Sequence, residues 1–144
     1  MKSTAVIVAT NAQTLAANDY VEFTSANNIT GKNVVFNAGT SPINLKAPGL
    51  YLVLVNANLL GTAAGNVTLQ LTDNGNAVTG ANATVTTADG SNYAASFSSI
   101  IQVTPSGCCC NCINPNVNTS NLQLQVLTTG VTVQNAAITI VKIA

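Results

Sequence analysis

The chain has 144 residues, of which 47% are hydrophobic and only 6% are charged, and its formal net charge is zero. Nucleic-acid binding requires a field of Lys and Arg that displaces counterions from phosphates, so this composition excludes it. The absence of His excludes the Ser-His-Asp and Cys-His relays of nucleophilic enzymes, and we expect neither a catalytic residue nor a cofactor.

The first segment with a strand pattern is 4–10. A signal peptide would need a longer uninterrupted apolar region than residues 5–9 supply. We therefore expect residues 1–18 to provide a first strand or an attachment arm to a single domain that spans 1–144. No apolar run approaches the roughly 20 residues of a transmembrane helix, so we expect no membrane partner.

Apolar and polar residues alternate along most of the remaining chain, as in β-strands with one buried face. Leu122, Leu124 and Val126, for example, alternate with glutamines. Turn-forming residues separate such runs, and Asn74-Gly75 predicts a type I′ hairpin because both residues tolerate positive φ. Another turn is expected at 26–28. The expected strands lie near 4–10, 19–25, 33–37, 42–46, 50–60, 66–72, 77–79, 83–87, 92–103, 121–128, 131–133 and 136–143.

Two of these segments, 51–60 and 136–143, are apolar on both faces. One face of such a strand belongs to the core of the domain, and the other meets either a second sheet or another subunit. An ordinary sandwich-core strand and a subunit contact both fit this pattern. Many short strands with regular turns and no helical period indicate an all-β sandwich or jelly roll.

Phe36, Ile43, Gly49 and Tyr51 resemble the signature of the C1q and tumour-necrosis-factor-like jelly roll, in which an aromatic residue precedes an apolar residue and then Gly-x-Tyr at these spacings. The chain departs from the family at Ile43 and Val53, where Phe is favoured. The resemblance implies a single-domain jelly-roll sandwich, and a homotrimer packed through the inner sheet around a threefold axis. The residues expected in the trimer core are Tyr51, Val53, Val55, Ile138, Ile140 and Val141.

Within that superfamily, the charge-poor composition is similar to decoration and fibre modules of bacteriophages and to domains of collagen-like spore-surface glycoproteins. The chain has no Gly-X-Y repeat, which counts against a full spore protein. The resemblance implies a structural virion surface protein, a capsid decoration or head fibre, that contacts itself and the major capsid or another virion protein. The alternative is a receptor- or glycan-binding head of a phage fibre, or an adhesin on a bacterial spore or cell surface.

The four cysteines cluster in a segment that Gly107, Asn114 and Pro115 mark as a loop. Disulfides within the loop or between subunits, a metal site and free thiols all fit this cluster. Zinc usually draws its ligands from separate segments, so one chain alone supplies a poor metal site, whereas several chains around an axis supply a better one. Disulfides would require an oxidising environment. The candidate residues are Cys108, Cys109, Cys110 and Cys112.

The acidic residues show no catalytic pattern. Asp19 and Glu22 are close in sequence but fall on different faces of the predicted strand, so we interpret them as solvated surface groups and not as paired carboxylates. Asp73 and Asp89 occupy turn positions that suit Asp for backbone reasons.

The cysteine cluster yields a direct test of covalent assembly. If its thiols cross-link subunits, denaturing electrophoresis without reductant will show a multiple of the single-chain mass, and reductant will return the single chain. Replacing all four cysteines by Ser gives the matched control, which should migrate as a single chain in both conditions. A wild-type mass that does not change on reduction would contradict disulfides between subunits.

Overall fold

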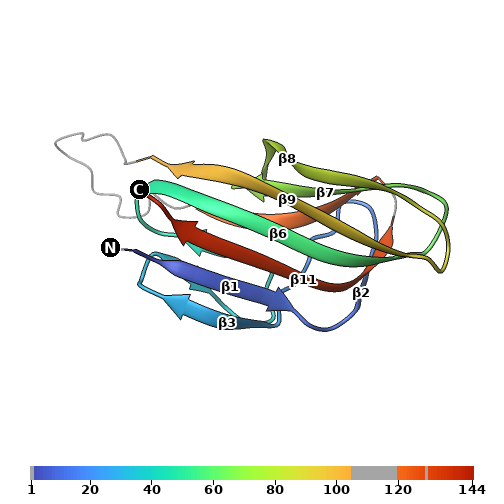
Figure 1. Ribbon diagram of the computed structural model, residues 1–144, viewed down its shortest axis with the longest axis horizontal. Coiled ribbons are helices and arrows are strands. Elements are labelled where there is room, and N and C mark those ends of the chain that lie inside the picture. The colour runs from blue at the N-terminus through green and yellow to red at the C-terminus, as the bar shows by residue number, and fades with distance from the viewer. Residues whose placement is uncertain (1, 105–119, 129) are drawn as a thin grey trace.

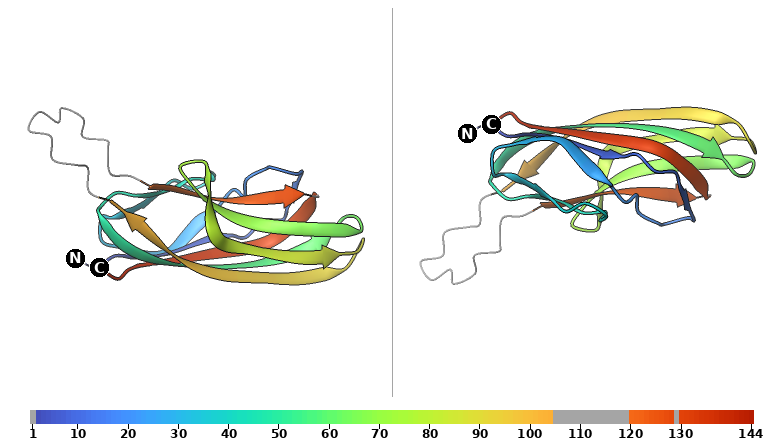
Figure 2. Two further views of the ribbon diagram at one scale, coloured as in Figure 1. Left: turned by 90° about the horizontal axis from the view of Figure 1, so that it is seen from above. Right: turned by 90° about the horizontal axis from the view of Figure 1, so that it is seen from below.

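The computed structural model describes residues 2–104, 120–128 and 130–144. Within these ranges the chain forms two sheets packed face to face (Figures 1 and 2). None of the described residues forms a helix that could cross a membrane. The strands are β1 (Thr4–Ala9), β2 (Gln13–Leu15), β3 (Ser25–Thr30), β4 (Val34–Phe36), β5 (Ile43–Leu45), β6 (Gly49–Gly61), β7 (Gly65–Asp73), β8 (Asn76–Thr87), β9 (Asn92–Val103), β10 (Ser120–Thr128) and β11 (Val131–Lys142).

The six-stranded sheet has the order β3-β1-β11-β6-β9, with β2 also paired to β11, and the five-stranded sheet has the order β4-β5-β10-β7-β8. Every pairing is antiparallel. Strands from the two ends of the described chain, β1 and β11, lie side by side in one sheet (Figure 1). The all-β jelly-roll sandwich expected from the sequence is therefore confirmed.

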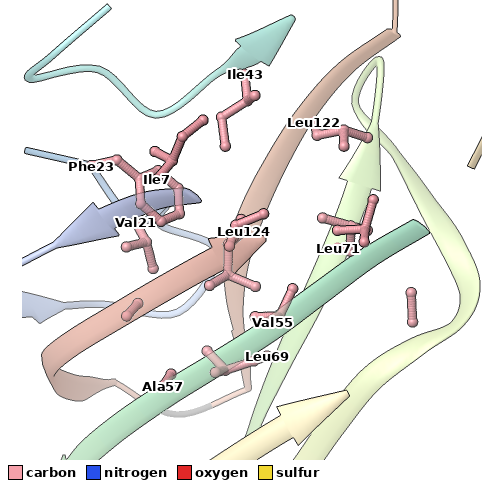
Figure 3. Close-up of a cluster of buried hydrophobic side chains, with 14 of the residues drawn as sticks. Ile7, Val21, Phe23, Ile43, Val55, Ala57, Leu69, Leu71, Leu122 and Leu124 are labelled. Carbon is pink, nitrogen blue, oxygen red and sulfur yellow. The ribbon is translucent and has the colours of Figure 1, made fainter. Parts of the chain in front are cut away.

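The core lies between the sheets, and alternate residues of strands such as β1, β6 and β11 contribute to it. Ile7 and Val55 project from the six-stranded sheet toward Ile43, Leu71 and Leu124 of the five-stranded sheet (Figure 3). These five side chains are at most 1% exposed. Burial of such apolar surface is the main stabilising contribution to a sandwich, at roughly 25 cal/mol per Å².

The prediction of a strand at 19–25 was wrong. Tyr20 and Phe23 form only isolated bridges, to Gln125 and Thr40. Phe23 is fully buried, and its ring packs edge-on against Phe36 at 6.4 Å between centroids. The apolar alternation in this segment thus reflects anchoring in the core and not membership of a sheet.

The strand β3 was missed, and the turn predicted at 26–28 lies within it. All six of its residues are exposed at the edge of the sheet. An edge strand of this kind has no buried face, so its sequence carries no period-two signal.

Two pairs of predicted strands are each one continuous strand. β11 runs through 131–142 with a register shift between Val133 and Asn135. β8 runs through 76–87, and its register against β7 shifts between Gln70 and Thr72. Bulges of this kind bend a strand without ending it. The sequence pattern is interrupted at these points, and two separate strands were therefore predicted in each case.

The Asn74-Gly75 hairpin is confirmed. Asn74 and Gly75 have φ of 52° and 83°, and they join β7 to β8 with Asp73 opposite Asn76. Both central residues therefore adopt the positive φ that a type I′ turn requires.

Gly49, part of the Gly-x-Tyr motif, lies where β6 begins and has φ of +142°. Leu50 donates its amide to the carbonyl of Ala144 at 2.9 Å, which brings residues 142–144 against the start of β6. A Cβ on Gly49 would collide with the Ala144 carbonyl and would come within 2.6 Å of Lys142 Cε. Glycine is required here by close approach as well as by backbone conformation.

We expect Gly49→Ala to lower the free energy of unfolding by about 2 kcal/mol or more, because strain and a collision with backbone add together. Gly39→Ala is the matched control, since Gly39 also has positive φ (81°) but has open space around the added Cβ. Chemical denaturation of both variants measures the difference, and equal losses would refute the steric explanation.

Candidate functional site

The candidate site is the outward face of the six-stranded sheet, which we call the outer face. Alternation along β6 turns Tyr51, Val53 and Val55 into the core and leaves Leu52 and Leu54 pointing away from it. The neighbouring strands contribute residues at matching register positions. The outer face comprises Thr4, Val6 and Val8 of β1, Ala137, Thr139 and Val141 of β11, Leu52, Leu54, Asn56 and Asn58 of β6, and Ala94, Ser96, Ser98 and Ile100 of β9.

One half of the outer face is apolar. Val141, Leu52 and Ile100 stand in one row across β11, β6 and β9, and Leu54 stands in the next row. Leu54 is 38% exposed and Ile100 is 56% exposed. Large apolar side chains left in contact with water on adjacent strands form the type of patch that marks an interaction site.

The other half of the outer face is polar and slightly hollow. Alanines, including Ala94 and Ala137, leave a depression of about 410 Å³. Asparagines surround it, and Asn58 donates its side-chain amide to Asn135 Oδ1 at 2.7 Å. Neutral amides and hydroxyls can exchange water for partner groups with a smaller desolvation cost than charged groups would pay.

The outer face carries no Lys, Arg, Asp or Glu. A charged side chain that becomes buried against a partner must be paired with an opposite charge, and it costs several kcal/mol if it is not. An uncharged face avoids that requirement. Its chemistry therefore suits burial against another protein surface, and its Ser and Thr hydroxyls have no acidic or basic side chain beside them on this face.

Five of the six residues predicted for a trimer core lie inside the sandwich of one protomer. Tyr51, Val53, Val55, Ile138 and Ile140 are each at most 1% exposed, whereas Val141 belongs to the outer face. Both alternating sets of β6 and β11 are apolar, so the sequence could not show which set met the second sheet. A contact between copies through this sheet would use Leu52, Leu54 and Ile100 together with Val141.

Tyr51 is a structural residue. Its hydroxyl donates to the Ala47 carbonyl at 2.8 Å, and Lys142 Nζ lies 6.0 Å from the ring centroid. Burial raises the pKa of Tyr51. The phenol is therefore neutral under ordinary conditions and ties the 47–51 turn to β11.

The predicted cysteine site lies outside the described residues, so Cys108, Cys109, Cys110 and Cys112 keep the three interpretations given above. In the part of the chain that the structure describes, no three His, Cys, Asp or Glu side chains gather in a group that could hold a metal ion.

Asp19 and Glu22 are both exposed, as interpreted from the sequence, but they line the same hollow, together with Tyr20. The segment that carries them is not a regular strand, and sequence spacing alone therefore misplaced them on different faces.

Asp73 is the acidic residue with a distinct environment. Its Oδ2 accepts a hydrogen bond from Ser120 Oγ at 3.2 Å, while its Oδ1 is buried without a partner among the described residues. Burial raises the pKa of Asp73, and the hydrogen bond from Ser120 only partly opposes this effect. The carboxyl stands at the end of β7 beside the Asn74-Gly75 hairpin and is hydrogen bonded to the first residue of β10, so we assign it a structural role.

The raised pKa of Asp73 predicts a pH dependence of stability. Between the ordinary value of 3.8 and its raised value, the native state holds more protons than the unfolded state, so the contribution of Asp73 to stability increases as the pH falls. We expect the free energy of unfolding of wild type, relative to Asp73→Asn, to increase from neutral pH to below 3.8. Denaturation series at several pH values test this, with Asp89→Asn as the control. If the difference in free energy of unfolding between wild type and Asp73→Asn does not change with pH, the raised pKa of Asp73 is contradicted.

No protein-family model matches the chain, and no curated protein matches it in sequence. Among solved structures, the globular domain of the zebrafish complement 1qA protein is similar over 99% of this chain and 98% of that one, with 10% identity and a TM-score of 0.70. Eiger TNF from S. frugiperda is similar over 100% of this chain and 92% of that one, with 8% identity and a TM-score of 0.69. The vertex protein of phage PRD1 is similar over 99% and 97%, with 16% identity and a TM-score of 0.57.

At these identities the likeness is one of fold. It confirms the C1q/TNF-like jelly roll that the spacing of Phe36, Ile43, Gly49 and Tyr51 predicted.

Proposed function

We propose that the chain is a structural subunit of a virion surface, a homotrimeric jelly roll that serves as a capsid decoration or head-fibre protein of a bacteriophage. The observation that carries this proposal is the uncharged outer face, on which Leu54 and Ile100 remain exposed. Its partners would be two further copies of the chain and the major capsid or another virion protein.

A ring of three copies needs two different surfaces on each copy, because the contacts in a threefold ring are heterologous. The outer face is the first of these surfaces. The edge formed by β8 and β9 is a suitable second one, since both strands are the outermost of their sheets and lie on the same side of the sandwich (Figure 1).

The β9 edge lacks the protection that free edges usually carry. β9 has 12 residues, none of them charged and none of them Pro, and its register against β6 is unbroken. Soluble proteins normally shield a long edge strand with Lys, Pro or a bulge, because its unpaired backbone groups attract other chains. An edge that an assembly covers does not need this shielding.

The comparisons support the proposal at the level of fold and general role. The likeness to C1q and TNF-like jelly rolls favours self-association through one of the two sheets, and we assign this contact to the six-stranded sheet. One protein with this fold is named as a vertex protein of PRD1. The low charge of the chain also supports an assembled state, because a neutral surface of amides and hydroxyls gives a free monomer little colloidal repulsion.

The test is the native mass of the protein, measured by sedimentation or native mass spectrometry at micromolar concentration. We expect a trimer for wild type, and monomers for Leu54→Asp and Ile100→Asp, because a charge buried without a partner costs about 3 kcal/mol or more. Asn37→Asp is the control, since Asn37 is exposed in the loop between β4 and β5 of the five-stranded sheet. A monomeric wild type, or variants that remain trimeric, would overturn the assembly proposed here.

A further inference from the structure

A hollow of about 490 Å³ lies between the 15–22 segment and the start of β5, and it has a mixed polar and apolar lining. Its size is within the range of small-molecule sites. Tyr20 and Leu15 are half-buried in it, and Ser41 adds a hydroxyl. The residues that line it are Leu15, Asn18, Asp19, Tyr20, Glu22 and Ser41.

The backbone under the hollow is fixed against β10. Asn18 donates its amide to the Val126 carbonyl at 2.7 Å, and Val126 returns an amide to the Asp19 carbonyl at 2.9 Å. Gln125 Nε2 adds a hydrogen bond to the Asn18 carbonyl at 3.1 Å. The segment therefore holds its side chains in place before any ligand arrives, which lowers the entropy cost of binding.

Further hydrogen bonds hold the carboxylate of Asp19 and the backbone of Glu22. The side chain of Gln13 makes two hydrogen bonds to the backbone of Glu22. Its Nε2 donates to the Glu22 carbonyl at 2.6 Å, and its Oε1 accepts from the Glu22 amide at 2.9 Å. Asp19 Oδ2 accepts the Ala16 amide at 2.9 Å. Among the described residues, none is hydrogen bonded to the carboxylate of Glu22, which is exposed and able to accept hydrogen bonds from a ligand.

The composition of the hollow selects the class of ligand. Two of the four acidic side chains of this charge-poor chain line it, and no Lys does, so an anion would be repelled. A Ca²⁺ ion needs six to eight oxygen ligands, and no third acidic side chain approaches among the described residues. Carboxylates accept strong hydrogen bonds from hydroxyl groups, and an aromatic ring provides an apolar surface for the C–H face of a sugar.

We propose that this hollow is a carbohydrate-binding site for a neutral pyranose. Asp19 and Glu22 accept hydrogen bonds from ring hydroxyls, Asn18 and Ser41 offer further polar contacts, and Tyr20 with Leu15 packs against the apolar face of the sugar. The site uses the side of the molecule next to β10 of the five-stranded sheet, whereas the outer face belongs to the six-stranded sheet. Sugar binding is thus independent of the self-association proposed above.

Saturation-transfer NMR of the full chain with methyl mannoside, galactose and N-acetylglucosamine, each at millimolar concentration, tests the site. We expect transfer to one or more of these sugars. Glu22→Gln and Tyr20→Ala should each weaken binding about tenfold, through loss of a charge-assisted hydrogen bond or of the packing surface. Asp89→Asn and Tyr93→Phe are the controls, because they alter an acidic residue and a tyrosine that do not line the hollow, and they should bind as wild type does.

Three results would overturn the proposal. The first is the absence of saturation transfer to any of the three sugars. The second is transfer that Glu22→Gln and Tyr20→Ala leave unchanged. The third is a change in the NMR chemical shifts of residues that line the hollow when CaCl₂ alone is added. Circular dichroism of each variant verifies that it is folded, and Glu22→Gln preserves side-chain size should Tyr20→Ala fail to fold. The native mass is measured on the same samples, so a failure of sugar binding is distinguished from a failure of trimer formation.

Discussion

The pairing of β6 with β11 at the centre of the six-stranded sheet is the constraint on which the rest of the molecule depends. Their register opposes Val53 to Ile140 and Val55 to Ile138, and these four side chains fill one wall of the core. The same register fixes what lies on the reverse side, because residues alternate between the faces of a strand. The register of β6 and β11 therefore determines both the packing of the core and the composition of the outer face. A shift of one residue would move the core side chains of a strand to the outer face.

Among the described residues, neutral hydrogen bonds hold many of the polar side chains. Hydroxyl pairs such as Thr4–Thr30 and Thr68–Thr84, both at 2.7 Å, bridge neighbouring strands. Gln70, buried in β7, donates to the carbonyls of Val78 and Ala81 and thereby fills the irregularity in β8. Interactions of this kind are not screened by salt, unlike surface ion pairs. A chain held together in this way does not need charged side chains for its stability. Its surface can therefore be nearly uncharged, which suits burial against a partner.

The sequence predicted the features that rest on a local pattern. Strands with one buried face, such as 121–128, and the Asn74-Gly75 turn follow from period-two alternation and from backbone preferences, and both were found in the structure. The features that depend on a distant partner were not predicted. β3 has no buried face to produce a signal, and the two apolar faces of β6 could be told apart only when the second sheet was in place.

The same distinction applies to the two candidate sites. A contact between copies was one of two interpretations of the doubly apolar strands, and Val53 and Val55 were the residues predicted for it. The structure buries both in the core of one protomer and leaves Leu52 and Leu54 on the outer face. The hollow at Asp19, Tyr20 and Glu22 was missed, because it arises where an irregular segment lies along β10. The hollow lies along β10 of the five-stranded sheet, whereas the outer face belongs to the six-stranded sheet. Contacts between copies through the outer face would therefore leave the hollow open to solvent.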